Sequence, residues 1–319
     1  LATHAHKRGA DVRARLAVIS EDAQRWRETV EGWFTQNEAI RPDDLDRGDE
    51  YQFYQMLVGS WPLDGSALAG EFADRLSAWW RKALREAKLK TGWVSPNESY
   101  EQAAEQFLRA ALDSSRSAAF LQSIEHYVGT IAPAAALNGI VQLILQCTAP
   151  GVPDTYQGTE FWDLSMVDPD NRRPVDFARR QGALASGAEE SEFRRDWHDG
   201  RIKQQVRHRL LQARRETPDL FVGTSYRPLS VTGVRQDDVV AFLRETQDAS
   251  LLVVAPLRCA AMVSAELTLS AAWWQDTRIE LPMIGAGWRP IIGGEVSGDA
   301  LAPGQPGGDF PCRVAIARR

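Results

Sequence analysis

The chain is poor in cysteine and carries no excess of basic residues. Its three cysteines, Cys147, Cys259 and Cys312, are odd in number and far apart in the 319 residues. This usage fits a reducing cytoplasm better than a disulfide framework, and it lacks the spacing of metal ligands. With 37 lysines and arginines against 43 acidic residues, the net charge is −6, which argues against a nucleic-acid partner.

Long apolar runs are also lacking. The longest candidate, from Ala132 to Cys147, contains Asn138 and Gln142, whereas a membrane-spanning helix needs about 20 consecutive apolar residues. We therefore expect no membrane partner. The first residues, starting at Leu1, include neither a Met nor the features of a signal peptide. We expect a piece of a longer, cytoplasmic polypeptide.

Helical periodicity dominates the first part of the chain. Apolar residues from Val12 to Trp33 recur at alternating spacings of four and three, which predicts one amphipathic helix. Tryptophans at such spacing, including Trp79, are more typical of a core than of a ligand-binding surface. The same pattern predicts further helices at 51–57, 72–87, 98–112 and 118–128.

A buried helix and a polar loop are expected next. Apolar residues are almost continuous from Pro133 to Cys147, which predicts a helix buried on most sides. After a Pro-Gly break, residues 152–157 are predicted to form a short buried strand that opens into a long polar loop. This order is typical of a barrel, where active sites collect at the carboxyl ends of the strands. A basic amphipathic helix is predicted at 200–215.

Beyond Pro218, β-type patterns replace helical ones. Short apolar runs are separated by Gly, Pro, Asp and Ser turns, which predicts an antiparallel sandwich of about 100 residues. The stretch 285–308 is rich in Gly and Pro and is predicted to be irregular. The predicted strands are 239–243, 251–255, 267–269, 279–281, 289–292 and 313–316.

The loop within 148–176 carries most of the clustered polar residues. Two interpretations are open: long ordered loops are usually functional, but Asp, Pro and Asn are also ordinary turn formers in a solvated acidic loop. Its charged residues are Asp154, Glu160, Asp163, Asp168, Asp170, Arg172, Arg173 and Asp176.

Four stretches resemble the maltooligosyltrehalose synthases, which are members of the α-amylase family. They read TAPGVPDTYQGTEFWDLSMVDPDNRRPVD at 148–176, THAHKRGADVRARLAVISE at 3–21, REAKLKTGWVSPNESYE at 85–101 and WHDGRIKQQV at 197–206. The resemblance implies an α/β fold: the C-terminal part of an α-amylase-type (β/α)8 barrel with a large all-helical insertion, followed by an antiparallel β-sandwich domain.

This resemblance also implies domain boundaries. It places the end of a barrel strand and its loop at 1–9 and the helical insertion at 10–130. The last barrel helices, the last strand and its long active-site loop follow at 131–216. The β-domain occupies 217–319.

The activity implied by the resemblance is an intramolecular transglycosylation of maltooligosaccharides. The reducing-end α-1,4 bond is converted to an α,α-1,1 bond with retention, which requires a carboxylate nucleophile and an acid/base carboxyl about 5 to 5.5 Å apart. In the family both precede the Thr-His motif, so this chain contains neither. The expected partners are a maltooligosaccharide and the missing N-terminal barrel half, with no cofactor and no metal.

The Thr-His motif departs from the family pattern. The family reads Thr-His-Asp-Thr-Lys-Arg, whereas this chain has Ala5 where the sugar-binding carboxylate belongs. By resemblance, His4 contacts the same sugar, and Lys7 and Arg8 lie beside the cleaved end. A solvated terminus is the alternative interpretation for these residues. His6 two residues after His4 is weak evidence for a metal site.

The DPDNRR stretch supplies the other predicted sugar-binding residues, Asp168, Asp170, Asn171, Arg172 and Arg173. A planar guanidinium can bind vicinal hydroxyls or hold a carboxylate in place, and the sequence does not assign these tasks between the two arginines. Asp154, Tyr156 and Glu160 are expected to support the site, with packing at the barrel rim as the alternative for Tyr156.

Two further classes of function stay open at this point. A catalytically incompetent glucan-binding or scaffold fragment would account for Ala5 and for the missing carboxylates. Another α-amylase-family glucanotransferase or hydrolase is disfavoured by the helical insertion and the VDPDNRRPVD stretch.

Overall fold

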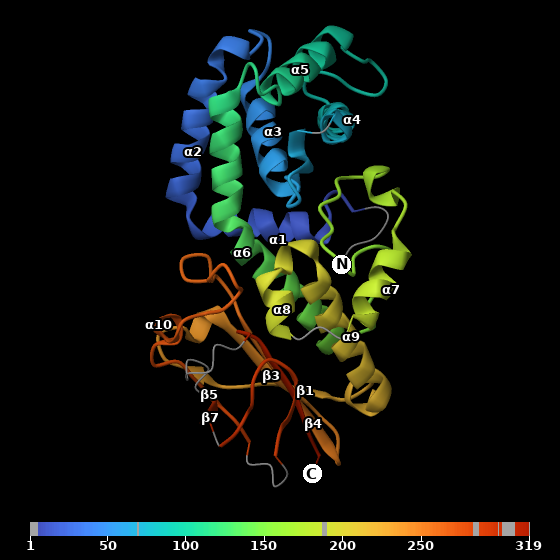
Figure 1. Ribbon diagram of the computed structural model, residues 1–319, viewed down its shortest axis with the longest axis vertical. Coiled ribbons are helices and arrows are strands. Elements are labelled where there is room, and N and C mark those ends of the chain that lie inside the picture. Colours follow the sequence, from blue (N-terminus) through green and yellow to red (C-terminus); the bar gives the residue numbers. More distant parts are fainter. Residues whose placement is uncertain are drawn as a thin grey trace. The chain divides into compact units, whose positions relative to one another are not determined.

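The computed structural model describes residues 6–68, 70–186, 190–282, 287–298, 300–301 and 310–318. The chain divides into two compact units (Figure 1). The helical unit comprises Ala2–Ala132 with Asp163–Pro174, and the sheet unit comprises Pro133–Trp162 with Val175–Arg319. Two predicted site residues, His4 and Ala5, lie outside the described residues.

The helical unit packs around aromatic side chains. Trp33 is fully buried, and its ring lies 5.5 Å from that of Tyr54 and 5.7 Å from those of Trp26 and Phe120. Such edge-to-face pairs add about 0.5–1.5 kcal/mol each beyond area burial. Its elements are α1 (Ala10–Val18), η1 (Ile19–Glu21), α2 (Ala23–Gln36), η2 (Glu38–Ile40), α3 (Arg47–Ser60), η3 (Ser66–Leu68), α4 (Gly70–Ala87), α5 (Glu98–Ala111), the start of α6 (Ala118–Thr148) and η4 (Asp170–Arg172).

The single helix predicted from Val12 to Trp33 is wrong, because the structure has two helices there. The first ends at Val18, a 3-10 turn follows, and α2 begins after Asp22. The Asp22 side chain accepts a hydrogen bond from the Arg25 backbone N–H at 3.0 Å. This N-cap satisfies a donor that a continuous helix would have used internally.

The break predicted between 128 and 133 is also wrong, because α6 continues through Pro133. A proline inside a helix removes one hydrogen bond and costs about 3 kcal/mol or more. Leu137, Ile140 and Ile144 are fully buried, and each contributes about 1.5–3 kcal/mol, which outweighs that cost. The helix is long and apolar enough to cross a membrane, but 67% of its most apolar window is buried, as in core helices of globular proteins.

The sheet unit adds helices and two antiparallel sheets. Its helical elements after α6 are α7 (Phe177–Ala185), α8 (Glu190–Arg195), η5 (Trp197–Asp199), α9 (Arg201–Glu216), η6 (Pro218–Leu220), η7 (Gln236–Asp238) and α10 (Ala271–Trp274). The helix predicted at 200–215 is confirmed by α9.

The larger sheet has the strand order β1-β3-β4-β8-β6, and the smaller one has the order β2-β5-β7. Every pairing is antiparallel, so the predicted combination of helices and antiparallel sheet is confirmed. The strands are β1 (Ser225–Pro228), β2 (Val231–Thr232), β3 (Val239–Glu245), β4 (Ala249–Pro256), β5 (Arg278–Glu280), β6 (Arg289–Ile292), β7 (Ala300–Leu301) and β8 (Arg313–Arg318).

Two predicted strands are corrected by the structure. Residues 152–157 form no strand, and Val152 is 90% exposed. This segment, VPDTYQ, pairs with no strand in the described part of the chain. Its backbone groups would stay unsatisfied if it were buried. Residues 267–269 contribute only an isolated bridge between Val263 and Leu269.

Candidate functional site

A pocket of about 260 Å³ lies within the helical unit. It is bordered by the segment before α1, by α3, by one face of α4 and by the loop 163–174. The pocket thus brings two predicted residues, Lys7 and Arg8, next to the start of the DPDNRR stretch. Its lining residues are Lys7, Arg8, Gln52, Trp79, Lys82, Ala83, Glu86, Ala87 and Val167.

Lys7 is fixed to α4 by one ion pair. Its Nζ lies 2.9 Å from Oε2 of Glu86, and the lysine side chain is 67% exposed. Exposed pairs of this kind contribute at most about 1 kcal/mol. The ammonium group can therefore leave Glu86 for a ligand at little cost.

Arg8 is the least satisfied charge of the pocket. Its Nε is buried and has no hydrogen-bond partner among the described residues. Burial lowers the pKa of the Arg8 guanidinium, since desolvation disfavours the charged form. No counter-charge for this half-buried cation is found among the described residues. Because such a cation is costly to the fold, the group suits a hydroxylated or anionic ligand.

The DPDNRR loop is held against α4 through Asp170. The Asp170 carboxylate accepts hydrogen bonds from Nε and Nη2 of Arg75 at 2.6 and 3.1 Å, and from the Met166 backbone N–H at 2.7 Å. Burial alone would raise the pKa of Asp170, but these bonds and the nearby Arg173 together lower it below its ordinary value. Asp170 therefore acts as the anchor of the loop.

Each arginine of the motif pairs with a different aspartate. Arg172 forms an ion pair with Asp168, and Nε of Arg173 lies 3.4 Å from Oδ1 of Asp170. Both arginine side chains are about half exposed. Lys82 donates to the Asp168 carbonyl at 2.8 Å, while Asn171 is buried. The two arginine side chains are thus partly open to solvent, while the ion pairs with their aspartates orient the guanidinium groups.

A close backbone junction ties this loop to the start of α1. The Gly9 N–H donates to the Ser165 carbonyl at 2.8 Å, and the Asp163 N–H donates to Oδ2 of Asp11 at 2.6 Å. A Cβ at Gly9 would lie 2.6 Å from the Asp163 carbonyl oxygen. Only glycine fits, and the junction fixes Lys7 and Arg8 relative to the loop.

Three predicted residues belong to the sheet unit. Glu160 forms an ion pair with Nε of Arg180 at 3.1 Å, and Arg180 also donates to the Gly158 carbonyl at 2.7 Å. Asp154 is exposed, and Tyr156 is half-buried. Glu160 thus contributes to the order of its own loop, and the support expected from all three stays a prediction.

The sequence analysis missed the contribution of α4. Arg75, Trp79, Lys82 and Glu86 recur at spacings of four, three and four, which places them on one helix face. Trp79 is 6% exposed and lines the pocket. A tryptophan flanked by charges of both signs on one face is the signal that distinguishes this stripe from an ordinary solvated face.

The sequence of the chain is similar to that of known proteins, although it matches no protein-family model. It is 36% identical to a Mycobacterium tuberculosis (strain H37Rv) protein named a maltooligosyl trehalose synthase, over 76% of this chain and 29% of that protein.

Solved structures of the same name align with the whole chain. The maltooligosyltrehalose synthase of Arthrobacter ramosus matches with a TM-score of 0.79 and 30% identity, over 100% of this chain and 38% of that one. A Sulfolobus tokodaii protein named a hypothetical maltooligosyl trehalose synthase matches with a TM-score of 0.74 and 27% identity, over 99% of this chain and 38% of that one. The chain thus spans well under half the length of these relatives.

Proposed function

Because the chain is homologous to part of the maltooligosyltrehalose synthases, we propose that it is the C-terminal portion of such an enzyme. The reaction is the conversion of the reducing-end α-1,4 bond of a maltooligosaccharide into an α,α-1,1 bond. The observation that carries this proposal is the alignment of the whole chain, at a TM-score of 0.79, with 38% of a solved synthase.

The architecture proposed for the complete enzyme follows the family. Residues 1–9 end a barrel strand and its loop, and 10–130 form a helical insertion. The last barrel helices and the long active-site loop lie within 131–216, and 217–319 form the C-terminal β-domain. All three cysteines are buried free thiols, which supports a reducing, cytoplasmic location.

In this proposal the chemistry is shared between the chain and the rest of the enzyme. The nucleophile and the acid/base carboxyl come from outside these residues, as a retaining mechanism requires two carboxyl groups. This chain supplies hydrogen bonds that hold the freed glucose while it turns and attacks. Arg8 suits that role because its guanidinium lines the pocket and its Nε has no hydrogen-bond partner among the described residues.

Arg172 and Arg173 complete the proposed sugar contacts. Their aspartate partners orient the guanidinium groups, and a planar fork binds two vicinal hydroxyls. Holding the intermediate sugar in a fixed orientation lowers the entropic barrier of the second bond-forming step. Exclusion of water from the pocket favours transfer to the 1-position over hydrolysis.

Product analysis tests this function. The full-length protein that contains this chain is incubated with maltopentaose, and the products are separated by anion-exchange chromatography. We expect a non-reducing isomer with a trehalosyl end, and no turnover by the chain alone. Release of shorter reducing sugars as the main products would identify a hydrolase instead, and no turnover by the full-length protein would contradict the proposed reaction.

A further inference from the structure

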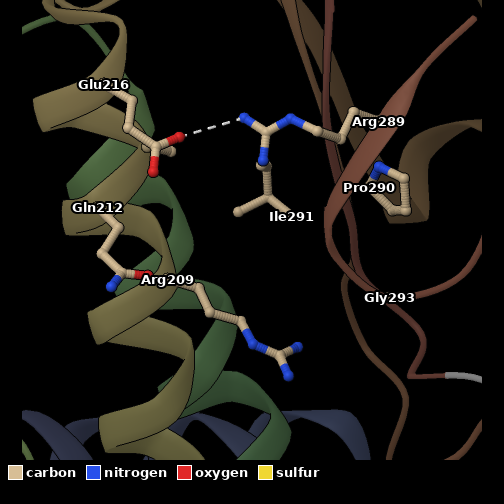
Figure 2. A pocket seen from close by; sticks show the side chains of 8 residues that line it. Arg209, Gln212, Glu216, Arg289, Pro290, Ile291 and Gly293 are labelled. Carbon is tan, nitrogen blue, oxygen red and sulfur yellow. Dashed lines mark hydrogen bonds and ion pairs between the residues drawn. The ribbon is translucent and has the colours of Figure 1, made fainter.

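A second pocket, of about 320 Å³, lies within the sheet unit between α9 and β6 (Figure 2). Its volume is at the lower end of the range of small-molecule sites. Arg209, Gln212 and Glu216 line it from α9, and Arg289 and Ile291 line it from β6. None of these residues has a role in the function proposed above.

The helix α9 uses a separate face for its structural contacts. Lys203 donates to the Phe161 carbonyl at 3.1 Å, and Arg207 donates to the Thr159 carbonyl at 3.2 Å. Arg214 donates to the Cys147 carbonyl at 2.7 Å. These three cations fasten α9 to the segment 147–161, so the helix is a rigid support for the side chains that line the pocket.

The wall formed by β6 is shaped by a bulge at the edge of the sheet. Pairing with β8 shifts register between Pro290 and Ile292, which leaves Ile291 without a partner. Bulges re-aim side chains and are frequent next to binding sites. Gly293 follows with φ +74°, and a Cβ there would lie 2.2 Å from the Cys312 carbonyl oxygen. Position 293 therefore has no room for a side chain, and the wall lies directly against the backbone of residue 312.

One weak ion pair, between Arg289 and Glu216, joins the two walls of the pocket. Nη2 of Arg289 lies 3.5 Å from Oε2 of Glu216, and both side chains are more than half exposed. A long, exposed pair of this kind contributes little and is easily exchanged. Figure 2 shows the Arg209 side chain directed from α9 into the same space. Among the described residues that line the pocket, the guanidinium groups of Arg209 and Arg289 and the carboxylate of Glu216 thus share one space.

We propose that this pocket binds a small hydroxylated anion, with a phosphate or carboxylate group and adjacent hydroxyls. The Arg209 and Arg289 guanidinium groups bind the anionic group, since a planar fork matches carboxylate and phosphate oxygens. Gln212 and Glu216 accept hydrogen bonds from the hydroxyls. Arg289 exchanges Glu216 for the ligand, which releases the Glu216 carboxylate for that second task.

Calorimetric titration of the full-length protein tests the proposal with three matched probes, glucose 6-phosphate, gluconate and glucose. We expect at least one of the two anions to bind at least about tenfold more tightly than neutral glucose, and to bind more weakly as salt is added. The comparison between the anions tells whether a phosphate or a carboxylate is preferred. Equal binding of all three, or none, would overturn the proposal.

Variants show whether this binding uses the pocket. R209A and R289A should each weaken anion binding about tenfold or more, as loss of a charge-assisted hydrogen bond does. R215A is the matched control, because Arg215 is an exposed arginine of α9 that does not line the pocket. Equal binding by all variants would contradict the assignment. A circular dichroism spectrum of each variant verifies that it is folded.

Discussion

The guanidinium group of Arg75 in α4 binds both carboxylate oxygens of Asp170, which lies 95 residues later in the chain. The side chains of both residues are mostly buried, with Asp170 only 8% exposed. A bidentate, buried pair of this kind fixes the relative orientation of the two side chains in addition to attracting them. Through it, α4 sets the position of the loop that carries Arg172 and Arg173.

Arg75→Ala should free this loop, because it leaves the buried Asp170 charge without its main partner. Breaking a buried pair on one side costs about 3 kcal/mol or more. The backbone N–H of Met166, which donates to Asp170, should then exchange with solvent roughly a hundredfold faster. Hydrogen exchange followed by mass spectrometry on peptides covering 163–174 measures this.

Arg109→Ala serves as the control for that experiment. Arg109 pairs with Asp74 at 2.9 Å, but these side chains are 48% and 67% exposed, so the pair contributes less than about 1 kcal/mol. Exchange in 163–174 should stay at the native rate in this variant. An equal acceleration in both variants would mean that Asp170 does not anchor the loop.

Acid should remove the contribution of the Asp170 carboxylate to the stability of the fold. The pKa of Asp170 is lowered from 3.8 in the folded protein, so the ionised carboxylate stabilises the fold above that value, and the contribution is lost as the pH falls through the lower, folded pKa. Asp170→Asn should melt below the native protein by a constant interval from pH 7 to about pH 5. The interval should narrow below about pH 4; a constant interval down to pH 2.5 would argue against a charged anchor.

Gly9→Ala should disturb the junction between α1 and the loop. Its methyl group would lie 2.6 Å from the Asp163 carbonyl oxygen and 2.9 Å from that of Ser165, so the backbone must shift. We expect a lower melting temperature and lower activity. Gly32→Ala is the control: no atom lies within 4 Å of its added Cβ, and removing a glycine inside a helix stabilises by about 0.5–1 kcal/mol.

Helices and strands with strong periodicity could be predicted from the sequence, whereas their interruptions could not. In α4, β3, β4 and β8 the pattern of apolar residues predicts which side chains are buried. The break at Asp22 depends on a single side-chain cap, and the continuity of α6 through Pro133 depends on buried contacts along the helix. The strand predicted at 152–157 was wrong for a related reason. A strand needs a neighbouring strand to pair with, and the local sequence does not show whether one is present.

Some residues of the candidate site could be predicted from sequence motifs, whereas others are found only through contacts in the structure. Lys7, Arg8 and the DPDNRR stretch were predicted as site residues from the resemblance to the family. The part played by Arg75 depends on a contact across 95 residues, which no local pattern encodes. Asp170 was predicted to bind sugar, and its occupied carboxylate assigns it an anchoring role that only the three-dimensional contacts reveal.

Ala5→Asp should raise the turnover of the full-length enzyme. The resemblance to the family predicts a carboxylate here that binds the sugar hydroxyls, and such a charged hydrogen bond in the transition state corresponds to at least about a tenfold change in rate. Ala5→Asn, which has nearly the same shape without the charge, should produce a smaller gain. Unchanged or lower activity of the aspartate variant would show that position 5 does not contact the sugar as assumed.

Arg8→Met separates a functional charge from a structural one. The methionine keeps the unbranched apolar stem and removes a desolvated cation that has no partner among the described side chains. The melting temperature should therefore be equal to or higher than that of the native protein. A clear loss of stability would mean that the guanidinium serves the fold.

The most direct test of the account is the kcat/KM of the full-length Arg8→Met enzyme for maltopentaose, measured as formation of the trehalosyl product. If this chain lines the sugar site, kcat/KM should fall at least about tenfold while the protein stays fully folded. A value of kcat/KM equal to that of the native enzyme would contradict the account.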